Sequence, residues 1–461
     1  MNETQIIYLF IFQMEVLPTE LLESIFIYFD GRDLSRCSLV CRRFYTIISN
    51  NHLWKNVCLR NDIKKEQDPV LTEDCTEESI KWRTFYQLYI QRCTNWRRDK
   101  YSKHKIGGES WFYQGWASYQ GICLLPTYTE NTVDVFRVTR KSFDLDQKIH
   151  LPIPGLEPTF LLTDIETVSA AKSNITVVYK RVDNIYKLDQ VFACKNGSVV
   201  RFTGDSEDHN DLSSFISTIY RRCGMVRVIE FKRNILWLCD YNSGRLFVIN
   251  ENDDKWFTID SVTFFKTGFD YVCFSTNKSL SISNIYGDII FNLKDTPIDL
   301  MSFNDKYLAI KSNERCRVET WNVKTKERLI SVEVTLDASI VVHKQFLVLL
   351  QLQNFSLSCH NIQSGEICWK ICYRLPGPPR APLFPCQMSV ILNKFLLIFP
   401  SHRYGQQAAR FSVININSGK IFYTSNFSGI VVEVSDRLLV TLSSGRDSYE
   451  CGNHLYIRSY I

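Results

Sequence analysis

The residues that could carry out chemistry are scattered along the sequence. There are 16 cysteines and 8 histidines among 461 residues, but no two cysteines have the C-x-x-C spacing of zinc and thiol-redox sites, and the histidines show no ligand spacing. The H-E-x-x-H, G-x-S-x-G, P-loop and G-x-G-x-x-G motifs are absent from the sequence. The sequence therefore predicts no catalytic, metal or cofactor site. The cysteines are interpreted as small buried hydrophobes in a reducing compartment.

The charge balance argues against a nucleic-acid-binding protein. The sequence has 54 Lys and Arg residues against 49 Asp and Glu residues, a formal net charge of +5, whereas nucleic-acid-binding domains concentrate basic residues on one face. The densest basic stretches, around residues 60 and 97, are interrupted by Asp or Glu, so we interpret them as solvated connectors. We expect the partners to be proteins and not nucleic acids.

An apolar run from Ile6 to Phe12 lies near the N-terminus. It is far too short to span a bilayer, and it lacks the basic segment and the cleavage site of a signal peptide. Met14 is an alternative start to Met1, and we expect residues 1–13 to be a disordered extension. Because no other stretch approaches about eighteen apolar residues, we predict a soluble intracellular protein, cytoplasmic, nuclear or both, with no membrane partner.

Residues 17–60 have the period of short helices. Pro18 can occupy the first turn of a helix, where its missing N–H is no loss, and Gly31 is expected to end that helix. Asp33 is the expected N-cap of a second helix, and a third short helix should carry Trp54. Three short helices bury little apolar surface by themselves, so they need a partner.

The first of these helices has a wider apolar stripe than a small helix pair can cover. Leu21, Ile25 and Phe29 lie four residues apart, and Leu22 and Phe26 lie on the neighbouring row. Periodicity alone leaves two interpretations open: a helical cap on the rest of the chain, or a docking face for another protein. In either case the stripe must pack against something else.

The same segment closely resembles the F-box. The matching phrases are LPxELLxxIFxYF, DLxxCSLVCRxF and LWK, in that order, within residues 14–60. F-box proteins are substrate receptors of cullin-based ubiquitin ligases, and their F-box helices interleave with the C-terminal helices of the small Skp adaptor, which docks on the cullin. The resemblance therefore implies an adaptor-binding domain and favours the docking interpretation.

The resemblance also implies which side chains meet the adaptor. Side chains of the first helix would fill the adaptor groove, and later residues would add contacts or hold the helices in place. The groove residues would be Leu17, Pro18, Leu21, Leu22, Ile25 and Phe26, and the others Leu34, Leu39, Val40, Cys41 and Trp54. Interfaces of this kind depend on a few buried apolar anchors.

Residues 61–94 are predicted to be a linker. Residues 61–79 are polar and mixed in charge, which is typical of an exposed loop. Residues 79–93 have the pattern of an amphipathic helix, and Asn95-Trp96-Arg97 comes next. This last segment resembles the one through which F-box proteins with WD repeats enter their propeller.

Residues 95–461 repeat a strand pattern that predicts a β-propeller. In the clearest copies an apolar b-type strand and a c-type strand, the second and third strands of a blade, are followed by a turn, at Ser364-Gly365 and Ser418-Gly419, and by a d-type strand. Each unit is counted from its b-type strand. Aromatic residues make up 13% of the chain, which also favours strands. We count eight units, with seven as the alternative, at a mean step of about 45 residues. The units begin near Ile122, Ile175, Ile235, Tyr271, Tyr307, Phe346, Phe395 and Leu438.

The repeats are WD-repeat-like in period and strand pattern, but they lack most of the signature residues. Only Trp321-Asn322 approaches the Trp-Asp pair, and the Gly-His dipeptide is absent. The last unit stops one strand short, which would leave backbone groups unpaired. We therefore predict that the segment from Asn95 to Ile106 supplies the missing strand.

Six arginines lie in or beside the c-type strands of the predicted blades, and some F-box propellers read phosphorylated motifs through arginines on one face. They are Arg137, Arg140, Arg315, Arg317, Arg403 and Arg410. Arginine suits bidentate phosphate recognition, but a solvated position on a polar strand face explains each of them as well. We predict no individual substrate-binding residue, and we expect a protein substrate, phosphorylated or not.

The predicted architecture is a small all-α F-box of three helices and a helical linker, followed by an all-β propeller. The resemblance implies substrate recognition in an SCF-type ubiquitin ligase, composed of Skp adaptor, cullin and F-box protein, without catalysis or a cofactor. Two alternatives stay open. One is a non-degradative F-box scaffold, and the other is a propeller hydrolase with acidic residues in its central channel.

Overall fold

In the computed structural model the chain forms two compact units, which divide between Asn95 and Trp96. Each unit has its own core. The residues that the structure describes are 17–61, 63, 82–108, 117–119, 122–127, 131–138, 143–152, 160–163, 167–172, 175–183, 185–195, 198–203, 226–232, 235–240, 245–250, 255–267, 271–276, 279–284, 287–294, 298–312, 314–374, 386–400, 409–427, 430–435, 438–444 and 453–460.

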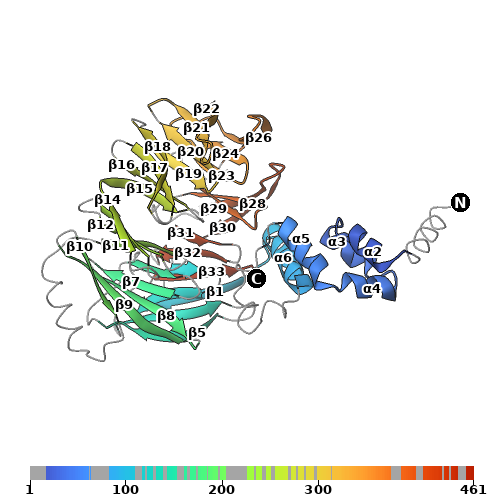
Figure 1. The fold of residues 1–461 in the computed structure, drawn as a ribbon, viewed down its shortest axis with the longest axis horizontal. Coiled ribbons are helices and arrows are strands. Elements are labelled where there is room, and N and C mark those ends of the chain that lie inside the picture. The colour runs from blue at the N-terminus through green and yellow to red at the C-terminus, as the bar shows by residue number, and fades with distance from the viewer. Residues whose placement is uncertain are drawn as a thin grey trace. The chain divides into compact units, whose positions relative to one another are not determined.

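The first unit is helical (Figure 1). Its helices are α2 (Thr19–Phe26), α3 (Gly31–Cys37), α4 (Arg42–Ile48), α5 (Asn51–Arg60) and α6 (Trp82–Arg97). The sequence predicts three helices before residue 61, whereas residues 17–61 of the structure form four. The additional helix is α4, which begins after Cys41 because the sulfur of this residue accepts a hydrogen bond from the backbone N–H of Phe44 at 3.4 Å.

The start of α3 also differs from the prediction. Asp30, and not Asp33, is the N-cap, and its carboxylate accepts hydrogen bonds from the backbone N–H groups of Arg32 and Asp33, both at 2.8 Å. Gly31 is the first residue of α3 rather than the end of α2. Glycine is needed here for space, because a Cβ at this position would lie 2.2 Å from Cε1 of Tyr86.

Aromatic side chains form the core of the helical unit. The rings of Phe26 and Phe44 pack edge to face with their centroids 5.3 Å apart. Trp54 is fully buried, and its indole N–H donates to the carbonyl oxygen of Ile48 at 2.7 Å. Tyr86 of α6 packs against Trp54, with 5.6 Å between the ring centroids. The helix α6 therefore shares the core of the helices before it.

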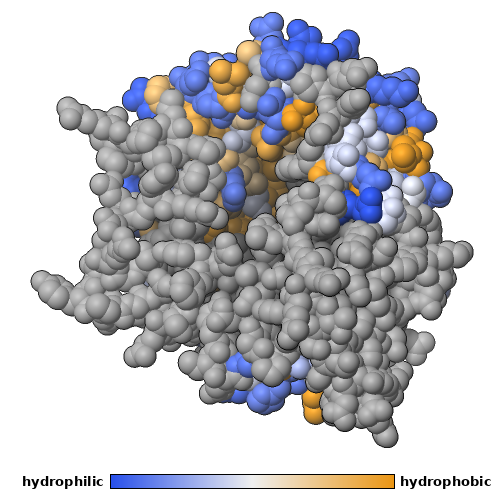
Figure 2. Space-filling view, turned by 90° about the vertical axis from the view of Figure 1, so that its left-hand side faces the viewer, coloured by the Kyte–Doolittle hydropathy of each residue, from blue (hydrophilic) through white to orange (hydrophobic). Residues whose placement is uncertain are grey.

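The second unit is a β-propeller. Its described strands form eight antiparallel sheets, the blades, of which seven have four strands and one has five. The predicted number of repeats, eight, is thus confirmed. The blades are arranged around a common centre (Figure 1), which Figure 2 shows as a hollow on one face of the ring.

The first four blades run from residue 117 to residue 294. They are β2–β5 (Ala117–Tyr119, Ile122–Thr127, Thr132–Val138, Phe143–His150), β6–β10 (Phe160–Thr163, Thr167–Lys172, Ile175–Val182, Ile185–Lys195, Ser198–Thr203), β11–β14 (Val226–Lys232, Ile235–Asp240, Arg245–Asn250, Lys255–Ile259) and β15–β18 (Val262–Thr267, Tyr271–Thr276, Ser279–Asn284, Ile289–Lys294).

The next three blades and the last one complete the ring. They are β19–β22 (Leu300–Asn304, Tyr307–Ser312, Arg317–Asn322, Arg328–Glu333), β23–β26 (Ser339–His343, Phe346–Gln351, Ser356–Asn361, Ile367–Cys372), β27–β30 (Cys386–Ile391, Phe395–Pro400, Ala409–Asn415, Ile421–Phe427) and β31–β33 (Ile430–Val434, Leu438–Ser444, Asn453–Ser459) together with β1 (Ser102–Gly108).

The last blade is completed by a strand from the other end of the chain. Its strand order is β1-β33-β32-β31, and β1 pairs antiparallel with β33 along its length from Ser102 to Gly108. The missing strand predicted from the sequence is confirmed, but its bounds differ. Because α6 continues to Arg97, the strand begins only at Ser102.

The second repeat is wrong in the sequence prediction. The segment from Ile175 was expected to be the second strand of its blade, but it is the third, β8. β6 is innermost, because it contacts β2 and β11 of the adjacent blades, and β7 is the second strand. β7 reads TVSAAK, whereas β8 opens with the more apolar ITVVY, so the apolar pattern pointed to the wrong strand. β10 adds a fifth, outer strand.

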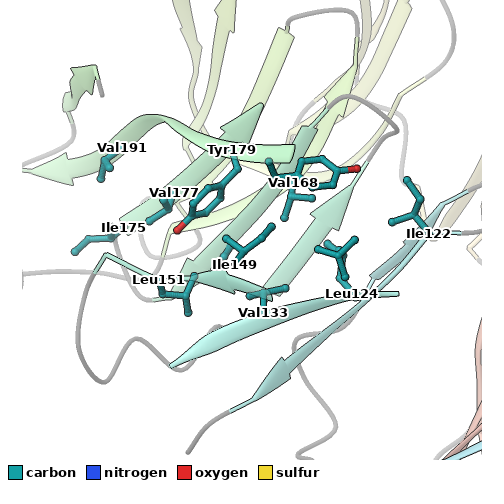
Figure 3. Packing of buried hydrophobic residues seen from close by; sticks show 13 residues of the cluster. Ile122, Leu124, Val133, Ile149, Leu151, Val168, Ile175, Val177, Tyr179 and Val191 are labelled. Carbon is teal, nitrogen blue, oxygen red and sulfur yellow. The ribbon is translucent and has the colours of Figure 1, made fainter. Parts of the chain in front are cut away.

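Apolar layers lie between neighbouring blades. Between β2–β5 and β6–β10, branched aliphatic side chains from both sheets face one another (Figure 3). Tyr179 belongs to this layer, and its hydroxyl donates to the carbonyl oxygen of His150 at 3.0 Å. Alternate residues of each strand supply the layer, because successive side chains of a strand point to opposite faces of the sheet.

The turn between the third and fourth strands has the same geometry in three consecutive blades. An asparagine ends the third strand, and its side-chain oxygen accepts hydrogen bonds from the N–H groups two and three residues further on, at 2.8–3.3 Å. These residues are Asn322, Asn361 and Asn415. Four residues after the asparagine the φ angle is positive, at Lys326 (62°), Gly365 (75°) and Gly419 (68°). The turns predicted at Ser364-Gly365 and Ser418-Gly419 are confirmed.

Candidate partner-binding surface

Neither a metal centre nor a membrane span is found in the described part of the chain. No three His, Cys, Asp or Glu side chains gather there in a way that could hold a metal ion. Among the helices of the same residues, none has both the length and the apolar character that crossing a bilayer requires.

Several cysteines have the character of core residues. Burial raises the pKa of the Cys58, Cys359 and Cys386 thiols to about 12. These thiols therefore stay protonated at neutral pH, which makes them poor nucleophiles and poor metal ligands. Burial and, to a smaller extent, the nearby carboxylate of Asp33 also raise the pKa of Cys37.

The helical unit carries large apolar side chains on its surface. Leu39 and Val40, between α3 and α4, are 84% and 42% exposed, and Leu21 of α2 is 51% exposed. Tyr28, just after α2, and Tyr45 of α4 are exposed as well. These exposed apolar side chains make the helical unit the candidate partner-binding surface.

The predicted adaptor-contact residues fall into three groups by exposure. Pro18, Leu21, Leu39 and Val40 are exposed, Leu17, Ile25 and Cys41 are half-buried, and Leu22, Phe26, Leu34 and Trp54 are buried. The structure therefore brings only part of the predicted set to the surface.

Leu22 and Phe26 lack the exposure that a direct groove contact requires. Both side chains are fully buried inside the unit. Phe26 packs against Phe29 and Phe44, with centroid distances of 5.6 and 5.3 Å. The face of α2 that carries Leu22 and Phe26 thus packs into the core of the helical unit. These two side chains hold α2 in place.

The segment that carries Leu17 and Pro18 is fixed by Arg43 of α4. The guanidinium of Arg43 donates to the carbonyl oxygen of Leu17 at 2.5 Å and to the hydroxyl of Thr19 at 3.3 Å. The start of α2 is thereby tied to α4. These hydrogen bonds fix the position of the backbone that carries Leu17, Pro18 and Leu21.

Tyr28 and Tyr45 are exposed aromatic residues that the sequence reasoning missed. Tyr28 follows Leu21 and Ile25 at steps of four and three residues, so the helical period could have indicated it. Tyr45 has no such signal. Its position depends on the fold, since the guanidinium carbon of Arg83 in α6 lies 5.9 Å from its ring centroid.

The described arginines among those considered for phosphate recognition lie in three different blades. In β2–β5, Arg137 pairs with a carboxylate of the neighbouring strand at 3.2 Å. In β27–β30, Nε of Arg410 donates to Oδ1 of Asn426 at 2.8 Å. Arg315 and Arg317 belong to a third blade, β19–β22. Arg140 and Arg403 lie outside the described residues.

Comparisons with known proteins give one family match, to the F-box-like family over residues 14–60. No curated protein matches the chain. Similar solved structures include BamB from Moraxella catarrhalis, with a TM-score of 0.46 and 10% identity over 77% of this chain and 98% of that one. Hsv2p of Kluyveromyces lactis has a TM-score of 0.40 and 8% identity, over 70% of this chain and 97% of that one.

The WD40 domain of Toxoplasma gondii coronin is also similar, with a TM-score of 0.39 and 9% identity over 65% of this chain and 80% of that one. Because all three TM-scores lie below 0.5, the strand order described above carries the fold assignment by itself. The chain thus carries an F-box-like segment at residues 14–60, and the strands that follow form a β-propeller of WD-repeat-like architecture.

Proposed function

We propose that this chain is the substrate-recognition subunit of an SCF-type ubiquitin ligase. The F-box-like match over residues 14–60 is the observation that carries the proposal. An F-box followed by a propeller of WD-repeat-like architecture is typical of non-catalytic interaction proteins. In this proposal residues 14–60 bind the Skp adaptor, residues 61–94 link them to the ring, and the propeller from residue 95 to residue 461 binds a protein substrate.

The adaptor contact would be made by the exposed and half-buried apolar side chains of the helical unit. Moving one exposed Leu side chain out of water contributes about 1.5–3 kcal/mol. Leu39 has the most surface to lose, since it is 84% exposed. The contact set is Leu17, Pro18, Leu21, Ile25, Leu39, Val40 and Cys41, while Leu22, Phe26, Leu34 and Trp54 support it from the core.

This function needs no catalytic group on the chain itself. A receptor that holds its substrate near a ubiquitin-conjugating enzyme raises the effective concentration of the acceptor lysine and orients it. The adaptor and cullin supply the connection between the two, and the chemistry belongs to the other subunits.

Co-purification with the Skp adaptor tests the proposal. Leu39→Asp with Val40→Asp places two carboxylates in an apolar contact, where desolvating an unpaired charge is costly. We expect adaptor recovery to fall at least about tenfold, which corresponds to about 1.4 kcal/mol. Thr84→Asp with Gln87→Asp, on exposed positions of α6, adds the same two charges elsewhere and should leave recovery unchanged.

A second measurement separates a receptor from a scaffold. Proteins that co-purify with the chain are incubated with the reconstituted ligase and ubiquitin. A receptor should direct ubiquitin onto at least one of them, and the Leu39→Asp/Val40→Asp variant should not. Adaptor binding without any ubiquitinated partner would make the chain a scaffold and would contradict the receptor role.

A further inference from the structure

One end of the propeller collects lysines in three consecutive blades. Because the strands of a blade alternate in direction, the turns after the first and third strands lie at one end of the ring, and those after the second and fourth strands lie at the other. In the blades β19–β22, β23–β26 and β27–β30, the turns after the first and third strands carry six lysines. These six define the basic turn surface: Lys306, Lys324, Lys326, Lys344, Lys394 and Lys420.

Lysines outnumber carboxylates on the turns at this end of the three blades. The turns that carry the six lysines hold three carboxylates, Asp305, Glu327 and Glu366, so lysines are in clear excess. Arg315 and Arg374 lie in described turns at the opposite end of the same blades. The near balance of 54 basic and 49 acidic residues in the whole chain therefore conceals a local positive field.

Hydrogen bonds between blades make this end of the ring continuous. Nδ2 of Asn304 donates to the carbonyl oxygen of Lys344 in the next blade at 3.0 Å. The indole N–H of Trp369 donates to the carbonyl oxygen of Ile416 in the blade after that, at 2.8 Å. The turns that carry Lys344 and Lys420 are therefore held to the preceding blade through a backbone carbonyl group in each turn.

Exposed aliphatic side chains stand at the edge of the same end. Ile367 and Ile421 are the first residues of the outer strands β26 and β30, and they are 55% and 42% exposed. Ile421 directly follows Lys420 in the chain. An occupant of this surface would therefore meet positive charge and apolar contacts together.

We propose that the basic turn surface binds an acidic polypeptide segment in which Asp or Glu residues are interspersed with aliphatic ones. The carboxylates would lie opposite the lysines, and the aliphatic residues would cover Ile367 and Ile421. Peptide binding by the basic turn surface does not depend on adaptor binding by the helical unit. Only the identification of the peptide as part of a substrate rests on the proposed function. In a substrate receptor, the acidic segment would be the feature recognised in the substrate.

The chemistry of the surface favours a polypeptide over other anionic partners. Lysines are hydrated point charges, which suit a spread of carboxylates better than one phosphate held by an arginine fork. Asp305, Glu327 and Glu366 would repel a uniformly anionic bilayer, whereas a peptide can place its neutral residues opposite them. Single-stranded nucleic acid requires aromatic side chains for base stacking, but the exposed large apolar residues described at this end are aliphatic.

Binding of a synthetic peptide to the full chain tests the proposal. The probe alternates Glu and Leu residues, and a reference peptide has Lys in place of Glu. Lys324→Glu with Lys420→Glu should weaken binding of the acidic peptide at least about tenfold, because each change turns an attraction into a repulsion. The matched control, Arg315→Glu with Arg374→Glu, changes the net charge equally at the opposite end and should weaken binding less than about twofold.

Two further measurements separate charge from folding. Lys324→Gln with Lys420→Gln removes the positive charges without adding repulsion and should give a smaller loss, about threefold. Raising the salt concentration from about 50 mM to about 300 mM should weaken wild-type binding at least about fivefold, since exposed charges are screened. Adaptor recovery should stay at the wild-type level in all these variants, so that failure here is distinct from failure of the proposed function.

Several results would overturn the proposal. Absence of acidic-peptide binding at millimolar concentration would do so, and so would equal loss in the two charge-reversal variants. Binding of the acidic peptide that is weaker than binding of duplex DNA or of phosphatidylcholine vesicles containing phosphatidylserine would assign the surface to a different class of partner.

Discussion

At Gly31 the packing of the helical unit depends on the absence of a side chain. A Cβ there would lie 2.2 Å from Cε1 and 2.3 Å from Cζ of Tyr86. The ring of Tyr86 cannot easily move, because it packs against Trp54 with 5.6 Å between the centroids. The close contact between α3 and α6 therefore consists of Gly31 packed directly against the ring of Tyr86.

Gly31→Ala should lower the free energy of unfolding of the helical unit by about 1–3 kcal/mol, the usual cost of overpacking. The sign is informative, because alanine in a helix is otherwise favoured over glycine by about 1 kcal/mol. Hydrogen exchange of the α3 amides in the full chain measures the change. Adding Tyr86→Ala to the same chain should remove the extra cost of the new methyl group. Increased protection of α3 in Gly31→Ala would contradict this packing.

The cysteines should react in an order set by burial. Burial raises the pKa of Cys58 and Cys386 to about 12, whereas Cys316 and Cys372 are exposed. The folded state favours the protonated form of the buried thiols, so their reactivity stays low until the pH approaches about 12. At about pH 8 an alkylating reagent should modify Cys316 and Cys372 before Cys58 and Cys386, as followed by mass spectrometry. Early modification of Cys58 in the folded chain would refute the buried assignment.

At the scale of elements, the closing of the ring is the feature on which the propeller depends. Trp96, in the last turn of α6, stacks on Tyr460 with 3.6 Å between the ring centroids, and both side chains are fully buried. The hydroxyl of Tyr460 donates to Asp99 at 2.9 Å, and Arg458 lies 3.7 Å from the same carboxylate. Burial raises the pKa of Tyr460 far above its ordinary value, so the phenol remains a hydrogen-bond donor.

Two substitutions at Tyr460 should separate the hydrogen bond from the stacking. Tyr460→Phe keeps the ring but loses the hydroxyl and its hydrogen bonds, the one to Asp99 among them, and should lower the free energy of unfolding of the ring by about 1–3 kcal/mol. Tyr460→Ala also loses the contact with Trp96 and should cost about 3–5 kcal/mol. Denaturant unfolding measures both, with the exposed Tyr28→Phe as control. Equal losses from the Phe and Ala variants would show that the stacking contributes nothing.

A strand or helix was predictable where its own residues show a hydrophobic pattern. It was not predictable where contacts with neighbouring elements determine its bounds or its place in the sheet. The closing strand β1 followed from counting strands, since the last repeat lacks one. β7 was missed because its small side chains carry no apolar run, although its place between β6 and β8 makes it a strand. α4 was missed because the break before it depends on the Cys41 cap, which no periodicity reveals.

The candidate site was predictable as a segment but not as a surface. The F-box phrases located Leu21 and Leu39, which are exposed. They could not separate these residues from Leu22 and Phe26, because burial depends on which row of α2 packs against Phe44. Tyr45 lies near α6 only because the chain folds back, and sequence spacing carries no information about that contact.

At the scale of the whole molecule, the chain combines two kinds of surface. The helical unit carries exposed apolar side chains, and one end of the blades β19–β30 carries lysines. The overall charge of +5 predicted neither, because a sum over the chain discards the position of each charge. The six lysines are far apart in the sequence. The direction of each strand shows that their turns all lie at the same end of the ring.

The affinity of the purified full chain for the purified Skp adaptor tests the central claim most directly. The account predicts a one-to-one complex in titration calorimetry, weakened at least about tenfold, or about 1.4 kcal/mol, by Leu21→Asp with Leu39→Asp. Thr84→Asp with Gln87→Asp should stay within about twofold of the wild type. A wild-type chain that does not bind the adaptor, or an affinity that the two leucine substitutions leave unchanged, would contradict it.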